Sequence, residues 1–127
     1  MKNIIFKVFY ILIIIYLIIF IPVLWGKRPL VVISGSMEPI LKVGGILYYE
    51  KIHLDDFKKD DILVYQLNEH IVSHRIVNIN EYGFETKGDN NSQPDEGLAT
   101  KSEIIGTVSL RIKYVGLPSI WIQELLR

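Results

Sequence analysis

A long apolar run near the N-terminus is the first pattern in the chain. Residues 8–26 contain no charged side chain, and the run lies between Lys7 and the pair Lys27-Arg28. A helix over this run would be apolar on every face, unlike an amphipathic surface helix. At about 1.5 Å per residue, such a helix nearly matches a hydrocarbon core of about 30 Å. The pattern therefore predicts a transmembrane anchor over residues 1–27.

Two other interpretations of this run are weaker. A cleavable signal peptide has a shorter apolar core and small residues at its cleavage site, and residues 25–29 (WGKRP) offer no such site. A buried core helix is rarely so long and so uniformly apolar. The lysines before the run nearly balance Lys27 and Arg28 after it, so charge alone sets no orientation in the membrane.

After residue 28 the pattern changes to short apolar segments separated by turn residues such as Gly44-Gly45 and Asn68-Glu69. Segments of this kind predict β-strands, and no long helical pattern lies between them. The expected fold class is mainly β: a small β domain over residues 28–127, preceded by a single transmembrane helix. The expected strands are residues 30–33, 46–51, 62–67, 71–79, 84–87 and 104–115.

Composition narrows the range of functions. Basic and acidic residues number 14 each, and no basic block suggests nucleic-acid binding. The chain has no cysteine, which excludes disulfides, thiolate nucleophiles and cysteine-based metal sites. His70, His74, Asp89 and Asp95 are types that bind metal, but they lack the spacing of a ligand motif. We therefore expect neither metal nor cofactor.

Residues 34–39 (SGSMEP) lie between the anchor and the first polar strands. Glycine permits backbone conformations that other residues resist, and proline fixes the chain soon afterwards, so this segment suits a serine held in one pose. An ordinary turn has the same composition. The segment carries chemistry only if a base and oxyanion donors lie nearby. Ser36 follows Gly26 by ten residues, a reach of at most about 35 Å, so it stays near the membrane face.

Three histidines are candidate bases. His53 and His70 lie beside polar turns and are expected on the surface, whereas His74 lies within a predicted strand. A rigid strand suits a general base, although a histidine in this position is more often a half-buried structural residue. The polar loop 87–95 supplies Asp89 and Asp95. Either one could accept a hydrogen bond from His74 and fix its tautomer, or the loop could consist of ordinary hydrophilic turns.

Taken together, these segments resemble the type I signal peptidases, in particular the branch of the endoplasmic reticulum, archaea and some spore-forming bacteria. After the N-terminal anchor, the matching motifs follow the order of the family over nearly the whole chain. They are SGSMEP at 34–39, DDILVY at 60–65, SHRIV at 73–77 and KGDNN at 87–91, with Asp95 six residues beyond Asp89. Each motif is weak alone, but the combination is specific.

The resemblance implies a role for each matched residue. Ser36 corresponds to the nucleophile, and Ser34 together with the Ser36 backbone N–H corresponds to the oxyanion donors. His74 stands where the usual bacterial enzymes have a catalytic lysine, which places the chain in the histidine branch. Asp95 corresponds to the aspartate most often assigned to the triad, and Asp89 to a nearby aspartate that supports the site.

The resemblance also implies a function. The chain would be a membrane-bound serine endopeptidase that cleaves N-terminal signal peptides from exported preproteins after small residues. Its partners would be secretory preproteins, the lipid bilayer and accessory membrane subunits. It would cross the cell membrane once, with the N-terminus in the cytoplasm and residues 28–127 outside. Many members of this branch have a second, C-terminal span, whereas here only a short apolar tail, residues 117–127, follows and predicts a short helix.

Two other functions are alternatives. A non-catalytic, membrane-anchored subunit would present preproteins to another protease, but it would not need Ser36, His74 and Asp95 together. A relative that shares only the β fold, such as the self-cleaving repressors, would resemble a Ser-Lys pattern and carry a DNA-binding module. Labelling by an acylating active-site probe separates an enzyme from a subunit.

Overall fold

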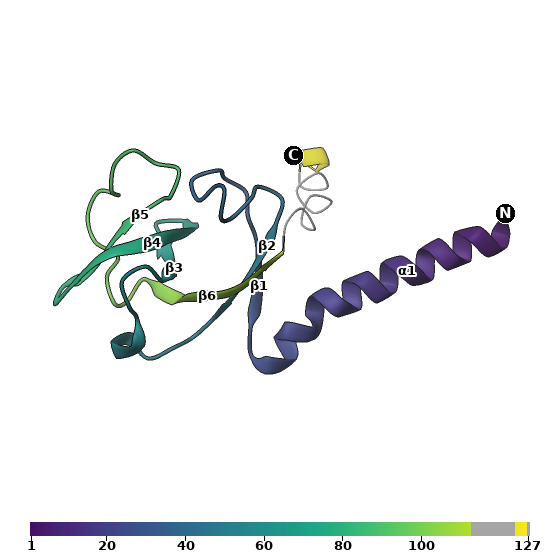
Figure 1. Cartoon of the computed structure of the whole chain (residues 1–127), viewed down its shortest axis with the longest axis horizontal. Coiled ribbons are helices and arrows are strands. Elements are labelled where there is room, and N and C mark those ends of the chain that lie inside the picture. Colours follow the sequence, from purple (N-terminus) through teal and green to yellow (C-terminus); the bar gives the residue numbers. More distant parts are fainter. Residues whose placement is uncertain (113–123, 127) are drawn as a thin grey trace.

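A computed structural model describes residues 1–112 and 124–126 of the chain. It shows a long helix that projects from a β domain, with the N-terminus at the far end of the helix (Figure 1). The short helix expected over residues 117–127 falls largely outside the described residues. So do the last residues of the strand expected over 104–115.

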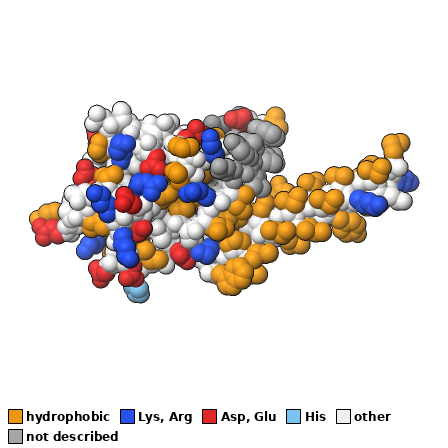
Figure 2. Space-filling view, viewed as in Figure 1, with side chains coloured by type: hydrophobic (Ala, Val, Ile, Leu, Met, Phe, Trp, Pro, Cys, Tyr) orange, Lys and Arg blue, Asp and Glu red, His pale blue; other side chains and the backbone are white. Residues whose placement is uncertain are grey.

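The projecting helix has two parts. The α-helix α1 covers Lys2–Phe20, and the 3-10 helix η1 continues it over Ile21–Trp25. The change of helix type coincides with Pro22, which has no N–H for an α-helical hydrogen bond. Apolar side chains cover almost the whole length of this helix, while charged side chains gather on the β domain (Figure 2). The segment Lys2–Trp25 is long and apolar enough to cross a membrane, as the sequence predicts.

Within the described residues the β domain is one sheet of six strands, in the order β1-β2-β6-β3-β4-β5. All neighbouring pairs are antiparallel, which confirms the mainly β fold class. The strand expected over residues 30–33 begins and ends two residues earlier. The elements of the domain are β1 (Arg28–Val31), β2 (Ile46–Glu50), η2 (Leu54–Asp56), β3 (Ile62–Leu67), β4 (His70–Asn80), β5 (Gly83–Lys87) and β6 (Ile104–Ile112).

Strand β3 lies between two apolar cores, because successive side chains of a strand point to opposite faces. Ile62 and Val64 belong to one core, which also contains Met37 from the segment after β1. Leu63 and Tyr65 belong to the other. This double burial explains why the start of β3 is continuously apolar instead of alternating. The burial of Met37 also anchors the segment that carries Ser36 in the interior of the domain.

One buried hydrogen bond joins the helix to the sheet. Tyr48 on β2 is fully buried, and its hydroxyl donates to the main-chain carbonyl of Ile19 in the last turn of α1. Carbonyls in a last helical turn lack helical partners, and Pro22, three residues further on, has no N–H to offer. Burial raises the pKa of the Tyr48 hydroxyl, which keeps this donor protonated. Tyr48 therefore caps the helix and fixes its end against β2.

We expect Tyr48→Phe to lower the free energy of unfolding by about 1–3 kcal/mol, because it leaves a buried carbonyl without its partner. The measurement is thermal unfolding of the full chain in detergent micelles. Tyr49→Phe is the matched control, since Tyr49 is the next residue on β2 and is only partly buried. Equal stability of the two variants would contradict the capping role of Tyr48.

Candidate active site

Three neighbouring strands direct polar side chains to one face of the sheet. β3 pairs with β4 so that His74 lies opposite Leu63, two residues before Tyr65. β5 pairs with β4 so that Thr86 lies opposite Ile76, two residues after His74. Directly opposed residues share a face, and so do residues two apart on a strand. Tyr65, His74 and Thr86 are therefore neighbours on one face.

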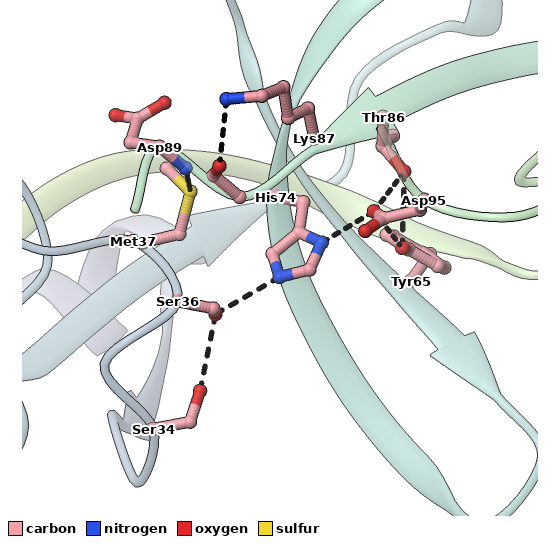
Figure 3. Close-up of polar contacts among 10 residues, drawn as sticks. Ser34, Ser36, Met37, Tyr65, His74, Thr86, Lys87, Asp89 and Asp95 are labelled. Atoms are coloured by element: carbon pink, nitrogen blue, oxygen red, sulfur yellow. Dashed lines mark hydrogen bonds and ion pairs between the residues drawn. The ribbon is translucent and has the colours of Figure 1, made fainter. Parts of the chain in front are cut away.

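Ser36, His74 and Asp95 form one chain of hydrogen bonds (Figure 3). His74 Nε2 lies 3.0 Å from Ser36 Oγ, and His74 Nδ1 lies 2.5 Å from Asp95 Oδ2. A carboxylate can only accept, so Nδ1 carries the ring proton, and Nε2 of the neutral ring accepts from the Ser36 hydroxyl. The residue pattern left open whether Asp89 or Asp95 bonds His74, and the family resemblance pointed to Asp95. In the structure Asp95 makes this contact.

Asp95 is held by two more side chains that share the face of His74. Thr86 Oγ1 donates to Asp95 Oδ2 at 2.8 Å, and the Tyr65 hydroxyl donates to the same oxygen at 3.2 Å. The Asp95 backbone N–H also donates to the Thr86 carbonyl at 2.8 Å. Burial raises the pKa of Tyr65 to about 12, with a smaller contribution from the charge of Asp95. Neither Tyr65 nor Thr86 was predicted from the sequence.

A second hydroxyl lies beside Ser36. Ser34 Oγ is 3.2 Å from Ser36 Oγ. Because the Ser36 proton is directed at His74 Nε2, the Ser34 hydroxyl is the donor in this contact. Ser34 thus offers a hydrogen-bond donor next to the oxygen that would act as a nucleophile.

The loop after β5 holds the backbone around Ser36. The Asn90 N–H donates to the Ser36 carbonyl at 2.8 Å, and Asn90 Nδ2 donates to the Gly35 carbonyl at 3.1 Å. Gly88 makes this approach possible, because a Cβ at that position would lie 2.6 Å from the Ser36 carbonyl oxygen. Met37 is buried in the core on the other side. The pose of Ser36 is therefore fixed from two directions.

Asp89 and Asp95 form hydrogen bonds with different side chains. Arg75 follows His74 on β4 and so points to the opposite face of the sheet. Its Nε and Nη2 donate to the two carboxylate oxygens of Asp89 at 2.8 and 2.7 Å, and its Nη1 donates to the Asp60 carbonyl. Hydrogen bonding to Arg75 lowers the pKa of the Asp89 carboxyl. Asp89 thus holds its loop to β4 and makes no contact of this kind with His74.

An open groove of about 300 Å³ lies beside Ser36 and His74. Its walls are mostly apolar and come from the region of β1 and from the start of β4. β1 ends the sheet order of the described strands, so its outer edge faces no further strand there. The lining residues are Leu30, Val31, Val32, Ile33, Ser34, Ser36, Met37, Leu41, Leu47, Ile71, Val72, Ser73 and His74.

The remaining candidate ligands do not gather into a site. His53 and His70 are exposed, as the sequence predicts. Over residues 1–112 and 124–126, the histidines and carboxylates form no group of three or more that could hold a metal ion.

No family model matches the chain, but curated relatives do. It is 30% identical over 110 residues to the signal peptidase complex catalytic subunit SEC11C of Homo sapiens, covering 75% of this chain and 57% of that protein. It is 30% identical over 129 residues to signal peptidase I W of Bacillus subtilis, covering 91% and 65%. With SEC11 of Colletotrichum graminicola, also named a catalytic subunit of the signal peptidase complex, identity is 37% over 109 residues, covering 74% and 63%.

These relatives, together with the apolar N-terminal helix, define the class as membrane-anchored proteins related to signal peptidases. Within this class, the chain belongs to the type I signal peptidase family. The chain spans 57% to 65% of the length of these three relatives.

We expect the ion pair of Asp89 and Arg75 to make stability depend on pH. The folded pKa of Asp89 lies below its unfolded value of about 3.9, so the contribution of the pair is complete above that pH. It is lost as the pH falls through the folded pKa. Wild type should therefore be more stable than Asp89→Asn near neutrality, and the difference should shrink below about pH 4.

Thermal unfolding of both proteins over a series of pH values measures this difference. Asp55→Asn is the matched control, because Asp55 is an exposed carboxylate in η2. A stability difference between wild type and Asp89→Asn that stays constant with pH would contradict the ion-pair role of Asp89.

Proposed function

We propose that this chain is a membrane-bound serine endopeptidase that cleaves N-terminal signal peptides from exported preproteins after small residues. The observation that carries the proposal is the chain of hydrogen bonds from Ser36 through His74 to Asp95. An apolar groove beside Ser36 offers a place for a substrate. The substrate class follows from the relatives, which are named as signal peptidases.

In the proposed reaction, Ser36 Oγ attacks the scissile carbonyl carbon while His74 Nε2 takes the Ser36 proton. Asp95 keeps the ring in the Nδ1–H tautomer and stabilises the imidazolium that forms. The Ser34 hydroxyl and the Ser36 backbone N–H donate to the developing oxyanion. The imidazolium then protonates the leaving amine, which departs. His74 next deprotonates a water molecule, which hydrolyses the acyl-enzyme and restores Ser36.

The groove suits an extended substrate. An extended peptide can add to a free strand edge through main-chain hydrogen bonds, while pockets read alternate side chains. The outer edge of β1 and the start of β4 would provide such a path, because both line the groove that holds Ser36. We propose that the apolar walls accept the small residues before the cut.

The end of the apolar helix, which lies shortly before Ser36 in the chain, supports a reaction at the membrane surface. The apolar helix ends at Trp25, whose side chain is exposed and of a type common at membrane interfaces. We propose that residues 1–27 cross the cell membrane once from a cytoplasmic N-terminus, and that residues 28–127 form the domain outside. The partners would be secretory preproteins and the lipid bilayer. Because two relatives are named as subunits of a complex, accessory membrane subunits are the first addition to test if the chain alone is inactive.

Cleavage of a preprotein by the detergent-solubilised chain tests the proposal. We expect the wild type to release the signal peptide and Ser36→Ala to release none, because the nucleophile is gone. Ser73→Ala is the matched control, since Ser73 also lines the groove but has no assigned chemical role. Equal product from wild type and Ser36→Ala would contradict Ser36 as the nucleophile. No product from either, even with a membrane extract added, would favour a presenting subunit.

The proposed oxyanion donor gives a separate expectation. Ser34→Ala should lower kcat by about 10²–10³-fold with little change in KM, the usual cost of one such donor. Ser34→Thr keeps the hydroxyl and should retain most of the activity. Steady-state cleavage of a preprotein by these variants measures both constants. If Ser34→Ala turns over as fast as the wild type, Ser34 takes no part in the reaction.

A further inference from the structure

Two buried hydroxyls hold Asp95, although neither has a part in the proposed reaction. We propose that Tyr65 and Thr86 are positioning residues that hold the Asp95 carboxylate against His74 and thereby set the tautomer of the imidazole. The proposal rests on the proposed peptidase function for its kinetic test. Its spectroscopic test needs no activity.

The need for such positioning comes from the location of Asp95. His74 lies on β4, which is paired on both sides, with β3 and with β5. Asp95 instead comes from the irregular loop after β5, and its side chain is 23% exposed. A carboxylate on such a loop can turn toward water unless other groups hold it. Tyr65 and Thr86 are only 3% and 2% exposed, so packing in the core holds both side chains in place next to Asp95.

The hydrogen-bond donors around Asp95 Oδ2 show how the hydroxyls of Thr86 and Tyr65 hold the carboxylate. Of the two hydroxyls, Thr86 Oγ1 lies closer to Asp95 Oδ2, at 2.8 Å, and gives its one proton to that oxygen. The Tyr65 hydroxyl lies 3.2 Å from both Asp95 Oδ2 and Thr86 Oγ1, so its proton has two acceptors at hand. His74 Nδ1–H reaches the same oxygen. If Oδ2 turned away from His74, the buried Thr86 hydroxyl would lose its acceptor and the Tyr65 hydroxyl would lose one of its two, which is unfavourable.

Charged groups among the described residues also act on Tyr65 and on the neighbouring Asp89. Glu103 and Asp95 act on Tyr65, and both favour its protonated form, so the donor is retained. Asp89 is engaged by Arg75, with Lys87 and His74 as weaker electrostatic neighbours. The substitutions below change none of these charges. An altered tautomer would therefore report the lost hydroxyl and not a new charge.

Three variants separate the hydroxyls from the shape of the core. Thr86→Val removes the hydroxyl at nearly constant volume, and Thr86→Ser keeps it. Tyr65→Phe removes the longer hydrogen bond. We expect Thr86→Val to lower kcat about 10-fold with KM nearly unchanged, well short of the roughly 10⁴-fold loss seen when a triad aspartate becomes asparagine. Thr86→Ser should restore kcat, and Tyr65→Phe should have a smaller effect than Thr86→Val.

The tautomer is measured directly by ¹⁵N nuclear magnetic resonance of histidine-labelled full chain in detergent micelles. His74→Gln assigns the His74 ring signals, and the exposed His53 and His70 are internal references. The wild type should show the Nδ1–H form, with Nε2 unprotonated, at a pH where the ring is neutral. Thr86→Val should show a mixture of both tautomers, and Thr86→Ser the wild-type pattern.

The kinetic and spectroscopic results together test the positioning role of Tyr65 and Thr86. A wild-type tautomer and kcat in both Thr86→Val and Tyr65→Phe would overturn it. A fall in kcat with an unchanged tautomer would mean that the hydroxyls serve only packing, and would also overturn it. If wild type cleaves no preprotein while the tautomer changes as expected, the proposed function fails and the positioning role stands. If Thr86→Val does not fold, Tyr65→Phe provides the same comparison.

Discussion

The hydrogen bond between His74 Nδ1 and Asp95 Oδ2 determines which ring nitrogen faces Ser36. Because the Asp95 carboxylate can only accept, Nδ1 carries the proton, and Nε2 of the neutral ring is then free to accept the proton of Ser36. The rest of the domain holds the two ends of this bond. His74 lies on β4, which is paired with a strand on each side. Thr86 on β5 forms hydrogen bonds with both the backbone and the side chain of Asp95.

The alternation of a β-strand divides the polar residues into two networks. His74 and Arg75 are adjacent on β4 and therefore point to opposite faces. One face carries the bond to Asp95 and the other the ion pair with Asp89. The first network orients the imidazole, and the second holds the loop whose Asn90 fixes the backbone at Ser36. Two nearby aspartates thus have separate tasks.

Much of this arrangement follows from the sequence, because it depends on local patterns. The limits of β3 and the turn after it were predicted correctly, as was the apolar N-terminal helix. The residue pattern alone did not decide between Asp89 and Asp95, because the choice depends on the path of an irregular loop. Only the family resemblance pointed to Asp95, which is the aspartate that contacts His74. The two-residue turn at Asn68-Glu69 sets the register of β3 against β4 and so places Leu63 opposite His74. Counting in this register from the sequence would have placed Tyr65 on the same face as His74.

Other features have no local signal. A register shift between β4 and β5 prevents simple counting from reaching Thr86. The bond from Tyr48 to Ile19 joins segments far apart in the chain, and no motif marks either residue. The early end of β1 at Val31 places Ile33 and Ser34 in a loop, where both line the groove. Tertiary contacts, and not propensities, decide these positions.

The most direct test of the proposed nucleophile is to trap it. The solubilised chain would be treated with an acylating probe, an activated peptide ester that ends in alanine, then quenched in acid and analysed by mass spectrometry. The proposed mechanism predicts an acyl group on Ser36, and no such group in His74→Ala, because His74 removes the Ser36 proton. Acylation at another serine, or equal acylation of Ser36 in His74→Ala, would contradict the mechanism.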